Sequence, residues 1–261
     1  MSRQDLIQAQ DLRFAYRPGL EVLHGVTVSA GAGKLMCVLG RNGSGKTTLL
    51  RLLLRRLKPS AGRVLLDGRS LGSYGPRELA RATAYVPQNP TSAFEFPVRE
   101  IVMMGRLPHG GALGLAGKQD LEVARLAMEM TGSAAFADRT LDELSGGEAQ
   151  CVMIARALAQ QPKVMLLDEP TSHLDMQNQL RIYRMMRRLA EDWGMCLICV
   201  SHDINMAARF ADELVVMRDG SVLADGPPRE VVREKTLSDA YGVEVELIDA
   251  GADNPPIVRA H

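Results

Sequence analysis

Short, almost unbroken apolar runs recur along the chain and predict buried strands. They lie at residues 35–39, 164–167 and 195–200, and continuous runs of this length are typical of parallel strands covered on both faces. Between them, residues 49–57 and 180–191 have leucines and other apolar residues at helical spacing. Strands that alternate with helices predict an α/β fold built on a mostly parallel sheet with flanking helices.

Two other segments depart from this pattern. Near the N-terminus Leu12, Phe14 and Tyr16 alternate with Arg13 and Ala15, which predicts an antiparallel β subdomain. Residues 90–139 have helical periodicity and no strand signal, which indicates a helical insertion. We therefore expect one domain at residues 1–250, with a helical subdomain inserted at about 90–160, and a flexible tail at 251–261.

Composition excludes several classes of protein. The chain has 261 residues, a net charge of +0 and a pI near 7.0, so it lacks the basic footprint of a nucleic-acid-binding protein. The N-terminus lacks the layout of a signal peptide, and the apolar runs are too short to span a bilayer. Cys196 and Cys199 lie in one predicted strand and point to opposite faces, which favours packing over redox chemistry. We expect a soluble, cytoplasmic protein unless a partner holds it at a membrane.

A glycine-rich stretch directly follows the strand predicted at residues 35–39. It fits the phosphate-binding pattern G-x-x-x-x-G-K-[ST] and consists of Gly40, Arg41, Asn42, Gly43, Ser44, Gly45, Lys46, Thr47 and Thr48. A strand that turns into a helix places backbone N–H groups at the positive end of the helix dipole, where a polyphosphate is stabilised. Lys46 can reach the β- and γ-phosphates, and Thr47 can offer its hydroxyl to Mg²⁺. The stretch predicts a nucleotide site of the P-loop NTPase kind.

Polar side chains follow three further predicted strands. Asp168 and Glu169 come directly after a buried run, where Asp168 fits a partner of Mg²⁺ and Glu169 a base that polarises water. Gln88 follows another strand, where its amide either points into the ligand crevice of an α/β sheet or faces solvent. His202 follows a third and can hydrogen-bond a terminal phosphate.

A helix start at Ser145 carries two consecutive glycines. Ser145 and Glu148 have the spacing of a capping box. Gly146 and Gly147 in the first turn cost stability unless something approaches the backbone closely. An anion is the natural candidate. Tyr16, before an N-terminal Pro-Gly turn, either packs into the sheet or presents its face to an adenine ring.

Together these motifs resemble the ATP-binding subunit of ABC transporters over residues 6–248. Residues 40–48 match Walker A, 164–169 match Walker B, and 144–148 match the LSGGE signature. The resemblance implies a catalytic base, a switch histidine and a Q-loop glutamine at Glu169, His202 and Gln88. It implies an adenine-stacking aromatic at Tyr16, a D-loop aspartate at Asp175, and Mg²⁺ ligands at Thr47, Gln88 and Asp168.

The resemblance also implies a mechanism. Two copies pair head to tail, so that ATP on one P-loop meets Ser145, Gly146 and Gly147 of the other copy. ATP closes this dimer, and hydrolysis opens it. One position departs from the family pattern, because Cys151 stands where an arginine is frequent.

The stretch from residue 87 to 109 looks like the cassettes of importers for iron–siderophore, haem or cobalamin. A single cassette then implies a separate transmembrane permease, an indirectly coupled substrate-binding protein, and a position on the inner face of the cell membrane. A soluble single-cassette ABC ATPase of iron–sulfur cofactor assembly remains the alternative. A DNA-repair ATPase is disfavoured because long heptad runs are missing, and a P-loop kinase because it would not need the signature.

Overall fold

The computed structural model describes residues 5–90, 95–110, 117–249, 251 and 255–261. The chain divides into two compact units. The first consists of Met1–Ser73 and Met186–His261, and the second of Tyr74–Met185. The second unit is wider than the helical subdomain expected at about residues 90–160, because it also contains the helix Pro76–Ala82, the first part of the helix Met176–Trp193 and two strands of the α/β kind.

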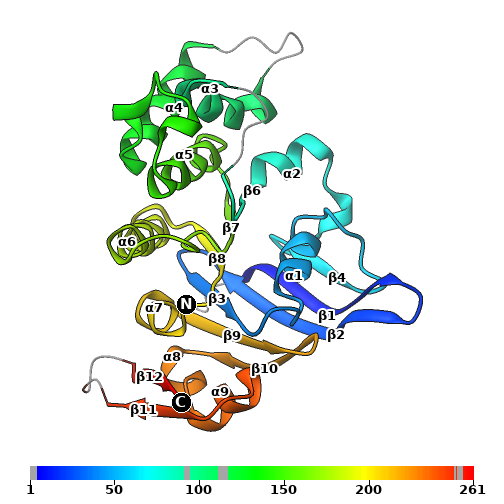
Figure 1. Cartoon of the computed structure of the whole chain (residues 1–261). Coiled ribbons are helices and arrows are strands. Elements are labelled where there is room, and N and C mark those ends of the chain that lie inside the picture. The colour runs from blue at the N-terminus through cyan, green and yellow to red at the C-terminus, as the bar shows by residue number, and fades with distance from the viewer. Residues whose placement is uncertain (1–4, 91–94, 111–116, 250, 252–254) are drawn as a thin grey trace. The chain divides into compact units, whose positions relative to one another are not determined.

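An antiparallel sheet forms the N-terminal part of the first unit (Figure 1, blue and cyan). Its strands run in the order β2-β1-β4-β5, with bounds Leu20–Gly31, Asp5–Arg17, Ala61–Leu66 and Arg69–Ser70. Alternate residues of β1 are buried, among them Leu12 and Phe14. Asp67 and Gly68 both adopt positive φ between β4 and β5, the geometry of a two-residue hairpin turn. The antiparallel β subdomain predicted from the sequence is confirmed.

The first unit also contains a mixed sheet that carries the phosphate-binding stretch. Its central strand β3 (Leu35–Leu39) is parallel to β8 (Cys196–Val200) and β9 (Glu213–Arg218). Strand β10 (Ser221–Gly226) is antiparallel to β9. Every residue of β3 and β8 is buried, as their unbroken apolar runs predict. The helices of this unit are α1 (Lys46–Leu53), α7 (Ile204–Phe210), α8 (Pro228–Val231) and α9 (Glu234–Tyr241), and a 3₁₀ turn follows at Leu71–Ser73.

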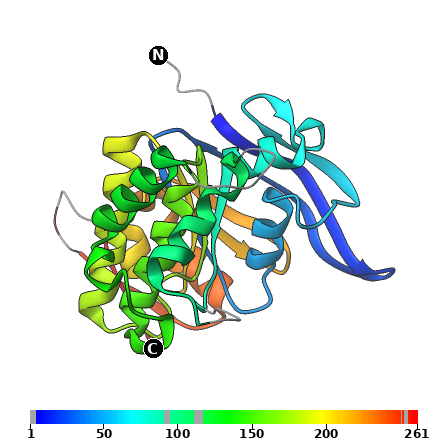
Figure 2. The ribbon, with the colours of Figure 1, turned by 90° about the horizontal axis from the view of Figure 1, so that it is seen from above.

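The second unit holds a bundle of helices and a parallel strand pair. Strands β6 (Thr83–Val86) and β7 (Val164–Asp168) pair in parallel. Helices α3, α4 and α5 pack against one another (Figures 1 and 2, green). The remaining bounds are α2 Pro76–Ala82, α3 Val98–Met103, α4 Lys118–Thr131, α5 Gly146–Ala159 and α6 Met176–Trp193, with 3₁₀ helices at Met104–His109, Ala134–Phe136 and Leu141–Glu143. The last residues of α6 belong to the first unit. The predicted fold class, an α/β core with antiparallel and helical parts, is confirmed.

The C-terminal segment corrects one expectation. Ile257–Ala260 form strand β12, which pairs antiparallel with β11 (Val245–Ile248), so the flexible tail predicted for residues 251–261 is wrong there. The Asn205 side chain accepts from the backbone N–H of Val258 at 2.8 Å and donates to its carbonyl at 3.1 Å. Pairing with β11 and the two hydrogen bonds of the Asn205 side chain stabilise β12. Residues 252–254 of the predicted tail lie outside the described residues.

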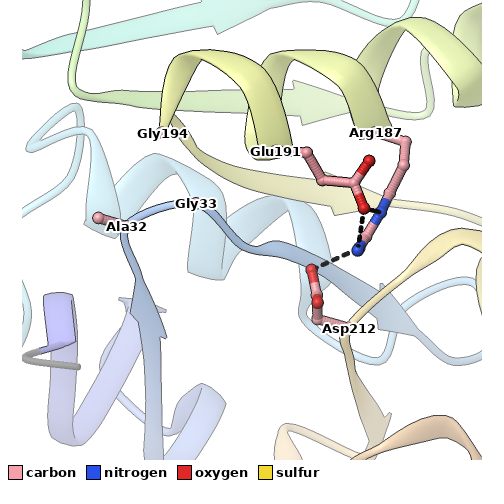
Figure 3. A pocket seen from close by; sticks show the side chains of 6 residues that line it. All are labelled: Ala32, Gly33, Arg187, Glu191, Gly194 and Asp212. Carbon is pink, nitrogen blue, oxygen red and sulfur yellow. Dashed lines mark hydrogen bonds and ion pairs between the residues drawn. The ribbon is translucent and has the colours of Figure 1, made fainter. Parts of the chain in front are cut away.

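A polar pocket of about 390 Å³ lies where β3 begins (Figure 3). Asp212 accepts hydrogen bonds from Leu35 N–H, Lys34 Nζ and an Arg187 nitrogen at 2.9, 3.0 and 2.7 Å, and Arg187 also pairs with Glu191. Burial alone would raise the pKa of Asp212, but these hydrogen bonds and the Arg187 charge outweigh it and hold the pKa below its ordinary value. Lys34 and Arg187 thus both form ion pairs with Asp212 inside the first unit.

All four cysteines are buried and none forms a disulfide. Burial raises the pKa of the Cys196 thiol to about 12, which leaves it protonated and unreactive near neutral pH. The prediction that Cys196 and Cys199 pack in the core is confirmed.

Candidate nucleotide-binding site

The phosphate-binding stretch connects the carboxyl end of β3 to the first turn of α1. Gly45 caps α1 in the left-handed region at φ 99°, and Gly40 has φ 144°. A Cβ at Gly40 would lie 2.3 Å from the Met217 carbonyl oxygen, and one at Gly45 would lie 2.6 Å from a Leu23 methyl carbon. Conformation and space therefore both require glycine at these two positions.

Lys46 and Ser44 give this loop the polar groups that an anion needs. Lys46 is 5% exposed, and its Nζ donates to the carbonyls of Gly40 and Arg41 at 2.7 and 2.9 Å, which fixes the ammonium beside the loop. The Ser44 hydroxyl is buried and has no hydrogen-bond partner within the described part of the chain. Buried hydroxyls are rarely orphaned, and a phosphate oxygen at the N-terminus of α1 would supply the partner. The loop fits a nucleotide phosphate.

Tyr241 is a member of this site that sequence reasoning missed. The sequence places it in a C-terminal helix without any local signal of a role, but its hydroxyl accepts the backbone N–H of Gly40 at 3.1 Å. Burial raises the pKa of Tyr241 to about 12, so the hydroxyl stays protonated near neutral pH. Tyr241 thus ties α9 to the first residue of the loop.

Tyr16 packs against the sheet and still leaves part of its ring exposed. Its ring packs edge-on against Phe14, with centroids 4.9 Å apart, and its hydroxyl lies 3.3 Å from Thr48 Oγ1 on α1. The residue is nevertheless 47% exposed. An exposed ring fixed beside the phosphate loop is available to stack on a planar base.

His202 lies at the same edge of the sheet as the loop. Val38 of β3 is paired in register with Val200 of β8, so Gly40 and His202 each lie two residues beyond their strand partners. His202 is exposed. The adjacent Asp203 caps α7 by accepting the Met206 N–H at 2.9 Å, which fixes the backbone at this strand end.

In the second unit, β6 and β7 bring the predicted catalytic carboxylates together with two polar partners. The Gln88 Nε2 donates to Glu169 at 2.9 Å, and the Tyr85 hydroxyl donates to Asp168 at 3.2 Å. Asp168 is 6% exposed. The contact with Glu169 favours the crevice alternative for Gln88 over the solvent-facing one.

Glu169 has an uncommon backbone conformation. Its φ is 48°, in the left-handed region that a side chain with a Cβ rarely adopts and that is retained most often at functional sites. The Ser172 N–H and hydroxyl both donate to its carbonyl, at 3.1 and 3.0 Å. These two hydrogen bonds from Ser172 therefore hold the turn after β7 in its strained backbone conformation.

The predicted capping box at Ser145 is confirmed. The Ser145 Oγ accepts from the Glu148 N–H, and the Glu148 carboxylate accepts from the Ser145 N–H at 2.8 Å and from its hydroxyl at 2.7 Å. These hydrogen bonds lower the pKa of Glu148. They fix the exposed start of α5, where Ser145 and Gly146 are open to solvent.

The structure gives Gly147 a second reason to be glycine. A Cβ there would lie 2.5 Å from Asn178 Cγ on α6, so packing within the unit demands glycine without any anion. Asn178 is in turn fixed by Asp175, which caps α6 by accepting the Asn178 N–H at 2.8 Å. For Gly146 the nearest side-chain atom is 3.3 Å away, on Leu174, and the anion explanation remains a prediction.

Cys151 lies inside α5 and is buried, and burial raises the pKa of its thiol. A small apolar residue thus fills the position where the family pattern has an arginine. Within the described ranges, neither a cluster of three or more metal-ligating side chains nor a helix long and apolar enough to cross a membrane is present.

The ABC transporter family model matches residues 23–172. The hemin import ATP-binding protein HmuV of Rhizobium meliloti (strain 1021) is 38% identical, over 97% of both chains. The ferric enterobactin transport ATP-binding protein FepC of Escherichia coli (strain K12) is 38% identical, over 91% of this chain and 88% of its own. The chain belongs to the ABC transporter family, as the sequence motifs predict, and is an ATP-binding cassette of the ATPase class.

Solved structures are similar along most of the chain. A metal-chelate type ABC transporter in an inward-facing conformation has a TM-score of 0.86 at 27% identity, covering 99% of this chain and 97% of that one. A dimeric bacterial ABC transporter cassette has a TM-score of 0.74 at 29% identity, covering 85% of this chain and 99% of that one.

Proposed function

We propose that this chain is the ATP-hydrolysing subunit of an importer that takes up haem or an iron–siderophore through a separate permease. The observation that carries the proposal is the identity of 38% along 97% of both chains with a protein named for hemin import. The second relative is named for ferric enterobactin transport. Because a cassette drives the permease and does not enclose the solute, the two substrate classes stay together in the proposal, and cobalamin, which none of these names contains, is a weaker member of it.

The residues around the loop divide the work on ATP. Backbone N–H groups of residues 40–45, the buried Ser44 hydroxyl and Lys46 bind the phosphates, and Tyr16 stacks on the adenine. His202 contacts the γ-phosphate. The remaining loop residues in these roles are Gly40, Asn42, Gly43, Gly45, Thr47 and Thr48.

The hydrolysis roles fall to Glu169 and to the ligands of Mg²⁺. Glu169 takes a proton from the attacking water. Gln88 orients the Glu169 carboxylate through their hydrogen bond of 2.9 Å. Mg²⁺ prefers oxygen ligands and is usually bound by one or two carboxylates together with substrate phosphates and water. Thr47, Asp168 and Gln88 supply such oxygens, so no larger protein cluster is required.

Two copies of the chain, each a single cassette of residues 1–250, complete the ATP sites of one another. Ser145, Gly146 and Gly147 at the exposed start of α5 face the γ-phosphate of the partner copy, and Asp175 lies at the dimer contact. The dimeric form of a similar cassette supports this. The dimer lies on the cytoplasmic face of the membrane, held there by the permease, and is coupled through it to a substrate-binding protein.

The test is capture of the permease. The Glu169→Gln protein is incubated with ATP and detergent-solubilised membranes of its source cells, with the Lys46→Ala protein as a matched control that cannot hold ATP. We expect a polytopic permease to be recovered with the first protein and to be reduced with the second. Recovery of soluble iron–sulfur assembly factors in its place would contradict the importer assignment and leave the ATP site unchanged.

A further inference from the structure

The C-terminal segment, made of α9, β11 and β12, contacts two different parts of the proposed phosphate site. All three elements belong to the first unit (Figure 1, orange and red). Helix α9 contacts the phosphate loop, and β12 contacts helix α7. The loop and His202 follow the neighbouring parallel strands β3 and β8. One segment therefore reaches both elements that the proposed function places at the phosphates of ATP.

Two contacts join α9 to the phosphate loop. The Tyr241 hydroxyl accepts the Gly40 N–H at 3.1 Å. Gly242 ends α9 at φ 71°, and a Cβ there would lie 3.3 Å from a guanidinium nitrogen of Arg41. A cation close to the last residues of a helix is stabilised by the negative end of the helix dipole. The first two residues of the loop are thus held against the C-terminal segment.

Asn205, in the first turn of α7, joins that helix to β12. Its Nδ2 donates to the Val258 carbonyl at 3.1 Å, and its Oδ1 accepts the Val258 N–H at 2.8 Å. The N–H and C=O of one strand residue point to the same side, so Val258 uses the edge of β12 that faces away from β11. The side-chain amide of Asn205 supplies there the donor and the acceptor that a further strand would supply.

A short series of hydrogen bonds connects the start of α7 to the end of β8. Asp203 caps the helix by accepting the Met206 N–H at 2.9 Å. The Asp203 N–H donates to Ser201 Oγ at 3.0 Å, and the Ser201 N–H donates to the Val38 carbonyl of β3 at 3.1 Å. His202 lies between these two anchored residues. The direction of its side chain therefore depends on where the first turn of α7 lies.

The contact of Asn205 with β12 is not required to keep α7 on the protein. Ala207 and Ala208 are 0% and 3% exposed, so the opposite face of the short helix is already anchored in the core. Asn205 itself is exposed, and hydrogen bonds at the surface replace bonds to water with little net gain in stability. What the two bonds do is fix the first turn, the part of α7 that follows His202.

We propose that Asn205 is a positioning residue, which uses β12 as a fixed support to hold His202 in the orientation that contacts the γ-phosphate of ATP. The inference rests on the proposed function, in which His202 makes that contact. Because the same C-terminal segment holds Gly40 through Tyr241, it keeps the loop and the start of α7 at a constant separation. Asn205 touches no nucleotide and acts only through His202.

The experiment compares the binding of ATP with that of ADP by isothermal titration. It uses the Glu169→Gln protein, so that ATP is not consumed during the titration, and adds Asn205→Ala, His202→Ala or both. Alanine favours a helix more than asparagine does, so Asn205→Ala removes the two hydrogen bonds without weakening α7. The matched control is Arg209→Ala, at another exposed position of the same helix.

We expect His202→Ala to weaken ATP binding about tenfold, because a hydrogen bond to a charged phosphate is lost. Asn205→Ala should weaken it about three- to fivefold, because the histidine is displaced but not removed. Neither change should affect ADP, which lacks the γ-phosphate. In the double variant Asn205→Ala should add no further loss. Arg209→Ala should leave both affinities unchanged.

Val258→Pro provides a second variant from the other side of the contact. Proline removes the N–H that Asn205 accepts and is tolerated on an edge strand where that N–H points away from its neighbour. We expect the same loss of ATP affinity as in Asn205→Ala. In both variants, amide exchange at residues 203–206 should become faster.

Equal weakening of ATP and ADP binding by Asn205→Ala, or an additional loss in the double variant, would show a general structural role and overturn the proposal. If His202→Ala weakens ATP binding and Asn205→Ala does not, only this inference fails. If His202→Ala leaves ATP binding unchanged, the proposed contact of His202 with the γ-phosphate fails together with it.

Discussion

Lys46 is the residue whose role follows most directly from its surroundings. Its ammonium is almost fully buried and is fixed by the carbonyls of Gly40 and Arg41, so little side-chain entropy remains to be lost when a phosphate binds. A preorganised cation makes charge-assisted hydrogen bonds, which are about twice as strong as neutral ones. The affinity of the loop for ATP should therefore depend on this one side chain.

We expect Lys46→Ala to weaken ATP binding about ten- to a hundredfold, which corresponds to the loss of about 1.5–3 kcal/mol for hydrogen bonds to a charged group. Isothermal titration with ATP measures it. Lys118→Ala removes an exposed lysine and serves as the control. Equal affinity of the Lys46 variant and the wild type would contradict the assignment of the loop.

Tyr241 should contribute to the same site through the backbone. Tyr241→Phe removes the acceptor of the buried Gly40 N–H, and an unsatisfied buried donor costs about 1–3 kcal/mol. We expect a melting temperature lower by about 3–6 °C, weaker ATP binding, and faster amide exchange in residues 40–45. Unchanged exchange there would show that the hydroxyl does not hold the loop.

The raised pKa of Tyr241 predicts that the stability of the fold declines at alkaline pH. Because burial raises its pKa to about 12 from the ordinary tyrosine value of about 10, its contribution to stability is fully present below about pH 10 and is lost as the pH rises towards 12. Tyr241→Phe should remove that part of the alkaline decline.

Sequence motifs name most residues of the proposed site but not their hydrogen-bond partners. Gly40 to Thr48, the Ser145 capping box and the strand-end carboxylates all follow from local patterns, because motif spacing is set by local backbone geometry. Tyr85 on Asp168 and Tyr241 on Gly40 were not predictable. The two residues of the first contact are 83 positions apart in the sequence, and those of the second are 201 positions apart. No local sequence pattern encodes a contact over such a separation.

At the scale of elements, buried strands were predicted closely and element ends less well. Strands β3, β7 and β8 could be predicted from unbroken apolar runs, because both faces of each strand are covered. Helix α1 was expected to continue to residue 57, but the Schellman motif at Arg55 ends it at Leu53. Strand β12 was not predicted from the sequence, because the interactions that stabilise it, with β11 and with the Asn205 side chain, come from other parts of the chain.

The junction between β3, α6 and β9 should depend on Asp212. Its side chain is 13% exposed and accepts from three donors on these segments. Asp212→Asn keeps one acceptor but removes the carboxylate charge that pairs with Lys34 and Arg187 and leaves Arg187 paired with Glu191 alone. The expected cost is about 2–3 kcal/mol in the free energy of unfolding. Urea unfolding at pH 7 measures it, with the exposed Asp239→Asn as the control.

The pKa of Asp212 sets how this cost varies with pH. Because the pKa in the folded state lies below the ordinary aspartate value of about 3.9, the stabilisation is present above about pH 4 and is lost as the pH falls through the folded-state pKa. The difference between wild type and Asp212→Asn should therefore shrink between pH 7 and pH 3. A constant difference would mean that the carboxylate charge is not the cause.

At the scale of the whole molecule, the chain consists of two units that each carry part of the proposed chemistry. The first unit contains the phosphate loop, Tyr16 and His202, and the second contains Gln88, Asp168 and Glu169 as well as the start of α5. The class of ATPase could be predicted from the sequence because both sets of motifs are local. The transported solute could not, because a cassette contacts the permease and not the solute.

The central claim is that Glu169 is the base of an ATPase whose two copies close on ATP. The most direct measurement combines steady-state ATP hydrolysis with light scattering of wild type and Glu169→Gln. Glutamine keeps the oxygen that accepts from Gln88 but cannot take a proton.

We expect Glu169→Gln to bind ATP with an affinity close to that of the wild type, to lose at least about a hundredfold in turnover, and to form a stable species of twice 28.5 kDa with ATP. Wild-type turnover in the variant, with no ATP-dependent dimer, would contradict the account.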